Sequence, residues 1–167
     1  MEIAVASIDE LLEQNLAYAR GFDKGGLPGP PAKGVAILAC MDARIDVHRI
    51  FGLEEGDAHV IRNAGGLPTD DAIRSLVISQ RVLKTTEIAL VHHTDCGMLK
   101  LREDDLTREL EEESGTSVPF ALGAISDLEE NLRDSVERIK ADPFIPNKDN
   151  VRGFVYDVTS GRLREID

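Results

Sequence analysis

The stretch Val35-Ala36-Ile37-Leu38-Ala39 is apolar at every position and too short for a buried helix. Three further runs of similar length follow it along the chain: Ala58-His59-Val60-Ile61, Ile88-Ala89-Leu90-Val91 and Phe154-Val155-Tyr156-Asp157-Val158. Short runs with little alternation are typical of strands buried between helices in a parallel sheet. The stretch 35–39 therefore predicts the first strand of such a sheet.

Helical patterns separate the predicted strands. Segment 70–83 has apolar residues at helical spacing, with Thr69 or Asp70 as its cap, and segment 123–141 repeats the pattern before Pro143. Because strands and helices alternate, we expect an α/β fold with one central, mostly parallel sheet flanked by helices. The acidic run 102–113 is expected to form a solvated helix face.

The N-terminal part of the chain predicts a projecting helix. Apolar residues recur at helical spacing from Ser7 to Phe22, and Ser7 is a suitable N-cap. A helix-breaking connector, Gly25-Gly26-Leu27-Pro28-Gly29-Pro30-Pro31, follows. We therefore expect a single domain, 1–167, made of a helical arm and connector, about 1–31, and an α/β core, 32–167.

Composition narrows the classes of function. The 167 residues include 19 Lys and Arg against 31 Asp and Glu, a net charge of −12. Such acidity argues against nucleic acid and against an anionic membrane as partners. The sequence contains no apolar stretch of transmembrane length and no basic targeting segment, so we expect a cytoplasmic protein.

Both cysteines are expected at one edge of the sheet. Cys40 follows the first predicted strand, and His93 and Cys96 follow the third. Sites in open parallel sheets form at the carboxyl ends of strands. Two thiolates and an imidazole suit zinc and leave a fourth position, as in catalytic zinc sites. The alternatives are a disulfide and two small buried side chains.

Asp42 and Arg44 alternate with Cys40, so all three side chains point to one side if the chain is extended. A carboxylate beside a guanidinium stays ionised and oriented. Asp42 then either accepts a hydrogen bond from a zinc-bound hydroxide or becomes the fourth zinc ligand. The simplest alternative is a surface ion pair.

Three motifs together resemble those of the β-class carbonic anhydrases, in particular the small, compact branch. They are Cys40-x-Asp42-x-Arg44, Arg62-Asn63-Ala64-Gly65-Gly66 and His93-x-x-Cys96-Gly97. The similarity runs from about Ser7 to the predicted strand near Val158. It implies one zinc ion per subunit, held by Cys40, His93 and Cys96, with Asp42 and Arg44 as a gating dyad.

The resemblance also implies an activity and an assembly. The activity is that of a lyase, the reversible hydration of carbon dioxide to bicarbonate and a proton by the zinc-bound hydroxide. The backbone amide of Gly97 is expected to face the substrate, and Gly65 and Gly66 to border the cleft. The assembly is a homodimer or a set of dimers, with the helix 7–22 lying over the neighbouring subunit.

Two other functions stay open at this point. The compact branch also contains carbonyl sulfide and carbon disulfide hydrolases with the same zinc ligands. A non-catalytic structural zinc protein would have Asp42 closing the fourth position of the zinc ion.

The sequence departs from the family pattern at two points. The glutamine that contacts substrate in larger members of the family has no equivalent here. Trp is absent, which argues against a tryptophan-built bicarbonate site.

Four further polar residues have less specific interpretations. His92 is expected to face away from the zinc, and His59 to be structural. His48 is either a partly exposed helical histidine or a proton relay. Asp95 either orients a zinc ligand or caps the following helix.

Overall fold

The structure is a computed structural model that describes residues 7–167; the first six residues of the predicted arm lie outside the described part. A five-stranded sheet with the order β2-β1-β3-β4-β5 forms its centre. The strands are β1 (Val35–Cys40), β2 (Ala58–Asn63), β3 (Glu87–His93), β4 (Val151–Tyr156) and β5 (Leu163–Ile166). The first four pair in parallel and β5 pairs antiparallel with β4. The predicted α/β class is confirmed.

β5 was not predicted from the sequence. The strand is short, and two residues of its sequence, Leu163-Arg164-Glu165-Ile166, are charged. An edge strand needs no continuous apolar run, because one of its sides faces solvent. The strand is defined by pairing with β4, including the Arg152–Glu165 ion pair across the two strands. The formation of β5 therefore depends on its pairing with β4, which the local sequence pattern does not reveal.

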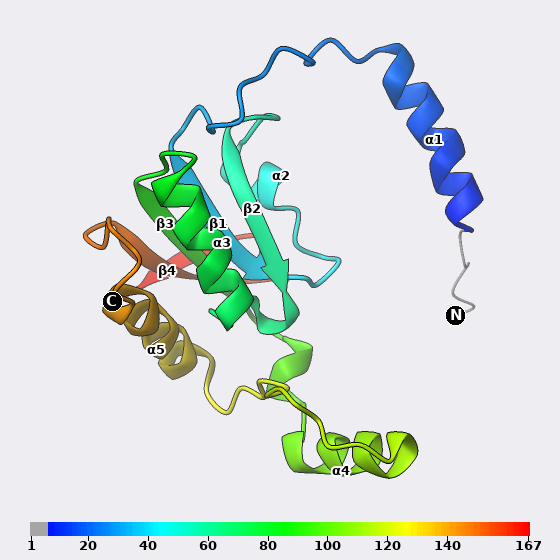
Figure 1. Ribbon diagram of the computed structural model, residues 1–167, viewed down its shortest axis with the longest axis vertical. Coiled ribbons are helices and arrows are strands. Elements are labelled where there is room, and N and C mark those ends of the chain that lie inside the picture. Colours follow the sequence, from blue (N-terminus) through cyan, green and yellow to red (C-terminus); the bar gives the residue numbers. More distant parts are fainter. Residues whose placement is uncertain (1–6) are drawn as a thin grey trace.

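Helices cover both faces of the sheet (Figure 1). The helices are α1 (Ile8–Arg20), α2 (Val47–Phe51), α3 (Asp70–Arg81), α4 (Glu103–Ser114) and α5 (Leu128–Ala141), with short 3-10 turns η1 (Ala64–Gly66) and η2 (Gly97–Leu99). Leu38 and Leu90 pack with α3 and α5, whereas Ile37 and Val91 pack with α2. Successive residues of β1 and β3 thus enter opposite cores, as the pleat of a strand requires.

α5 begins five residues later than the sequence pattern predicts. Asp127 is its N-cap and accepts a hydrogen bond from the amide of Glu130 at 2.8 Å. The preceding backbone is held outside a helix, because the carboxylate of Glu103 accepts from the amides of Leu122 and Ala124 at 2.8 and 2.9 Å. A tertiary contact therefore overrides helical spacing in this segment.

α1 projects from the rest of the molecule (Figure 1). Ser7 caps it in a capping box with Glu10, and it ends at Arg20, two residues before the predicted end. None of its residues is buried. Within residues 7–167, no helix combines the length and the apolar character needed to cross a bilayer.

Candidate metal centre

Three predicted ligands meet at the carboxyl edge of the sheet. Cys40 is the last residue of β1, His93 is the last residue of β3, and Cys96 directly precedes η2. Because β1 and β3 are parallel neighbours, their ends lie side by side. One donor atom from each residue lies within 4.8 Å of the others, and all three residues are buried. The predicted convergence of these residues is confirmed.

The donor set fits a zinc ion. The Cys40 and Cys96 sulfur atoms lie 3.9 Å apart, close to the ~3.8 Å that two thiolates ~2.3 Å from a tetrahedral zinc would have. Both cysteines are free, and their separation is well above the ~2.05 Å of a disulfide. The disulfide alternative is therefore wrong for this structure.

His93 has the tautomer that a metal ligand needs. Its Nδ1 lies 2.9 Å from the carbonyl oxygen of Thr94, and a carbonyl can only accept, so Nδ1 carries the proton. Nε2 is left with its lone pair, buried and without a hydrogen-bond partner. Such an orphaned acceptor beside two sulfur atoms is satisfied by a bound metal ion.

The two thiols differ in their acidity. Burial works to raise the pKa of Cys40, but hydrogen bonds to the thiolate, among them those from the backbone amides of Asp42 and Gly65, outweigh it and bring the pKa to about 7. Burial raises the pKa of Cys96. Since a metal binds thiolates, occupation of the site releases protons and becomes stronger with rising pH.

Asp42 and Arg44 form a close pair beside the donor cluster. The backbone amide and Nε of Arg44 both donate to Oδ1 of Asp42 at 2.9 Å, and Nη2 donates to Oδ2 at 2.7 Å. These bonds hold the pKa of the Asp42 carboxyl well below its usual range. Oδ2 of Asp42 lies 3.8 Å from Nε2 of His93. The carboxylate is thus ionised, oriented and next to the position that a metal would occupy.

Arg62 is a site residue for which the sequence analysis assigned no role. Its Nε and Nη2 donate to the carbonyl of Cys40 at 3.0 and 2.8 Å, and Nη2 also donates to the carbonyl of Asp42 at 2.7 Å. Arg62 lies near the end of β2, which pairs with β1. The signal in the sequence was its place at the start of the Arg62-Asn63-Ala64-Gly65-Gly66 motif, but its partners follow from the sheet register, which places Arg62 opposite Ala39.

The glycines of the predicted cleft differ in their exposure to solvent: Gly66 is buried and Gly97 is exposed. Gly66 is buried at φ +68°, and a Cβ there would meet the Cys40 nitrogen at 2.8 Å. The close approach of η1 to β1 therefore requires glycine at this position. Gly97 is exposed, with open space where its Cβ would lie.

The histidines outside the cluster occupy three different environments. His92 is fully buried, in the core between the sheet and α5, where burial lowers its pKa to about 4. His59 bonds to the hydroxyl of Ser79 at 2.7 Å, which agrees with a structural role. His48 is exposed on α2.

Asp95 has neither of the two roles considered from the sequence. Its carboxylate contacts Arg44 and Lys100, and the turn η2 begins without a side-chain cap. The side chain therefore bonds to two cations and neither caps η2 nor contacts a ligand.

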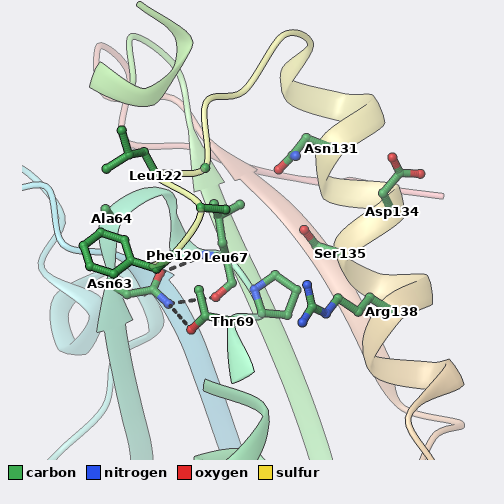
Figure 2. Close-up of a pocket in the computed structure, with 13 residues that line it drawn as sticks. Asn63, Ala64, Leu67, Thr69, Phe120, Leu122, Asn131, Asp134, Ser135 and Arg138 are labelled. Carbon is green, nitrogen blue, oxygen red and sulfur yellow. Dashed lines mark hydrogen bonds between the residues drawn. The ribbon is translucent and has the colours of Figure 1, made fainter. Parts of the chain in front are cut away.

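A cavity of about 530 Å³ opens near the same edge of the sheet (Figure 2). Polar side chains of α5, including Asn131, Ser135 and Arg138, line one side, and Leu67 and Leu122 lie on another. None of the three metal donors lines it. The cavity includes Asn63, whose side chain bonds to the backbone of Leu67, so it adjoins the loop that packs on Cys40.

Comparison with known proteins agrees with this site. A family model described as carbonic anhydrase matches residues 35–163. The β-carbonic anhydrase 1 of Mycobacterium tuberculosis is 52% identical over 158 residues, covering 95% of this chain and 96% of that protein. A crystal structure of a carbonic anhydrase from Streptococcus mutans superposes with a TM-score of 0.90 at 38% identity, covering 99% of this chain and all of that one.

A carbon disulfide hydrolase from Acidithiobacillus thiooxidans is more distant, at 33% identity over 184 residues, covering 92% of this chain and 85% of that protein. Sequence similarity therefore favours the carbonic anhydrases over the hydrolases that share the scaffold. With the family model matched over most of the chain and the Cys-His-Cys cluster in place, this chain belongs to the β-class carbonic anhydrase family.

Proposed function

We propose that the protein catalyses the reversible hydration of carbon dioxide. In this reaction a water oxygen bonds to carbon, one water O–H bond breaks, and bicarbonate and a proton leave. The observation that carries the proposal is the buried Cys40, His93 and Cys96 cluster with the Asp42–Arg44 pair beside it. The 52% identity to a β-carbonic anhydrase supports the same substrate.

Cys40, His93 and Cys96 would hold one zinc ion in each subunit. When bound, zinc with three protein ligands acts as a Lewis acid that lowers the pKa of water to about 7. The protein side chains organise what surrounds it. Burial of all three donors keeps competing water away, and the Thr94 carbonyl holds the His93 ring in one orientation and one tautomer.

Asp42 would orient the attacking water. Arg44 keeps the carboxylate ionised, and an ionised carboxylate only accepts hydrogen bonds. It therefore selects an orientation in which the water O–H points at Asp42 and the oxygen lone pair points away, toward carbon. The backbone amide of Gly97, an exposed residue, is the proposed donor to a substrate oxygen. Gly65 and Gly66 are proposed to border the cleft, with Gly66 packed against the backbone of Cys40.

The test is stopped-flow hydration of carbon dioxide on protein with a measured zinc content, with carbonyl sulfide and carbon disulfide assayed in parallel. Fast hydration supports the proposal. Consumption of carbon disulfide or carbonyl sulfide with feeble hydration would assign the chain to the hydrolases. Full zinc content with no activity on any of the three substrates would indicate a structural zinc protein.

The active protein is proposed to be a homodimer or an assembly of dimers. The apolar side chains of α1, Ile8, Leu11, Leu12 and Leu16, are all more than half exposed. An apolar helical stripe of this kind is stable when another surface covers it. A second copy of the chain is the proposed cover, and the projecting position of α1 (Figure 1) supports this.

A further inference from the structure

Asp95 has an unusual backbone between two of the metal donors. Its φ is +54°, one of two such values for non-glycine residues in the described part of the chain. L-residues adopt this left-handed conformation at a cost of roughly 1 kcal/mol, and aspartate tolerates it better than most. A strained residue next to a ligand points to a function that requires its geometry.

In this conformation, two oxygen atoms of Asp95 accept hydrogen bonds from Arg44. Nη1 of Arg44 donates to Oδ2 of Asp95 at 2.9 Å, and Nη2 donates to the Asp95 carbonyl oxygen at 3.1 Å. The other carboxylate oxygen, Oδ1, accepts from Nζ of Lys100 at 2.6 Å. The Asp95 carboxylate is therefore itself held by a second cation.

The guanidinium of Arg44 is consequently held along both of its edges. Nε and Nη2 face Asp42, and Nη1 and Nη2 face Asp95. A guanidinium bound to a single carboxylate keeps the rotations of its long stem, whereas one held on two sides loses them. The direction in which Arg44 presents its donors to Asp42 is thus determined by Asp95.

We propose that Asp95, supported by Lys100, is a positioning residue that keeps Arg44, and through it Asp42, in the orientation used for carbon dioxide hydration. This inference rests on the proposed function. It adds to the Asp42–Arg44 pair two residues, Asp95 and Lys100, that contact neither the metal donors' side chains nor the reacting atoms.

The contribution to overall stability is expected to be small, which makes the role separable from folding. Side chains of Arg44, Asp95 and Lys100 are 46%, 52% and 71% exposed, and ion pairs with this exposure contribute little to stability. The effect of removing Asp95 should therefore appear in the chemistry and in the metal environment and leave the melting temperature nearly unchanged.

The experiment uses four variants of the zinc-loaded protein. Asp95→Asn removes the charge and keeps a residue that tolerates positive φ, and Asp95→Gly removes the side chain and the backbone strain together. Lys100→Met removes the supporting cation, and Lys100→Arg restores it. The matched control is Asp105→Asn on α4, because Asp105 also lies between two cations, Arg102 and Arg108, away from the site.

Both Asp95 variants are expected to lose kcat by about tenfold, with KM and zinc content unchanged, as expected for misorientation of a group near the reaction. Lys100→Met should show a smaller loss that Lys100→Arg reverses. The second readout is the visible absorption spectrum of the cobalt(II)-substituted proteins. It should change in the Asp95 variants, because Asp42 is no longer held in one position near His93, and should not change in Asp105→Asn.

Wild-type activity separates the two hypotheses. If zinc-loaded wild type does not hydrate carbon dioxide, the proposed function fails. If wild type is active and both Asp95 variants match it in kcat and in the cobalt spectrum, the positioning role is wrong. A loss of kcat that Asp105→Asn shares would equally overturn it, since the effect would then follow from surface charge. A loss confined to Asp95→Asn, with Asp95→Gly normal, would contradict the role of the carboxylate, because glycine lacks the carboxylate as well.

Discussion

Arg62 binds the backbone carbonyl of Cys40 with two nitrogen atoms, Nε at 3.0 Å and Nη2 at 2.8 Å. The same Nη2 reaches the carbonyl of Asp42. One side chain from β2 thus holds the backbone on both sides of Met41. The thiol of Cys40 and the carboxylate of Asp42 are presented from a segment that a neighbouring strand keeps in place.

Arg62→Met is expected to weaken zinc binding and to lower the free energy of unfolding of the zinc-free protein by about 1–3 kcal/mol, since charge-assisted hydrogen bonds contribute on this scale. Competition with a zinc chelator and urea denaturation measure the two effects. Arg62→Lys should be intermediate, because one amine replaces two donors. Arg49→Met, an exposed arginine of α2, is the control. Unchanged zinc affinity in Arg62→Met would show that the backbone needs no such support.

Cys40→Ser and Cys96→Ser are each expected to abolish stoichiometric zinc binding, because a hydroxyl replaces a thiolate ligand poorly. Zinc per chain, measured by atomic emission after dialysis, gives the result. Circular dichroism checks that the fold persists. A variant that keeps one zinc per chain would exclude the substituted cysteine as a ligand.

Asp42→Asn should keep zinc and lose hydration activity by about 100-fold or more, the range found when a group that manages a reacting proton is removed. The amide cannot remain an acceptor-only partner for water, whereas its size preserves packing. Zinc content and stopped-flow rates are compared with Asp46→Asn, which alters the N-cap of α2 and should stay active. Wild-type rates in Asp42→Asn would remove this residue from the mechanism.

The double variant Leu12→Asp with Leu16→Asp should dissociate the proposed dimer. Both side chains lie on the exposed apolar stripe of α1, and burying a carboxylate in an apolar interface is strongly unfavourable. Light scattering after size-exclusion chromatography gives the mass. Glu13→Gln on the same helix is the control. A wild type that is monomeric at all concentrations contradicts the assembly.

Glu103→Gln should destabilise the protein in a pH-dependent manner. Accepting hydrogen bonds from the amides of Ala124 and Leu122 lowers the pKa of Glu103 below its usual value in the folded protein. A lowered folded pKa means that this stabilisation is present above the unfolded pKa and is lost as pH falls through the folded value. The difference in urea midpoint between wild type and variant should therefore be largest near neutral pH and vanish in acid. A constant difference would assign the effect to packing.

Much of the fold and of the metal site could be read from local sequence. Apolar runs on both faces of the strands predict a buried parallel sheet, and parallel strands necessarily bring their carboxyl ends together. The sequence therefore predicts the convergence of Cys40, His93 and Cys96 without any knowledge of tertiary contacts. The spacing of Cys40 and Asp42 likewise predicts the carboxylate beside the donors, because it depends only on near neighbours in the chain. Arg44 departs from the extended chain assumed in that prediction: it lies in a turn in which the Ile45 amide donates to the Asp42 carbonyl at 3.0 Å.

Tertiary structure alone decided the rest. The roles of Arg62 and Asp95 depend on where long side chains and backbone carbonyls from separate elements meet, and no periodicity encodes that. The late start of α5 depends on Glu103, about 20 residues away in the chain, and β5 exists through its pairing with β4. Ligand chemistry and hydrophobic pattern are local properties of the chain, whereas the orientation of Arg44 between Asp42 and Asp95 is a property of the folded protein.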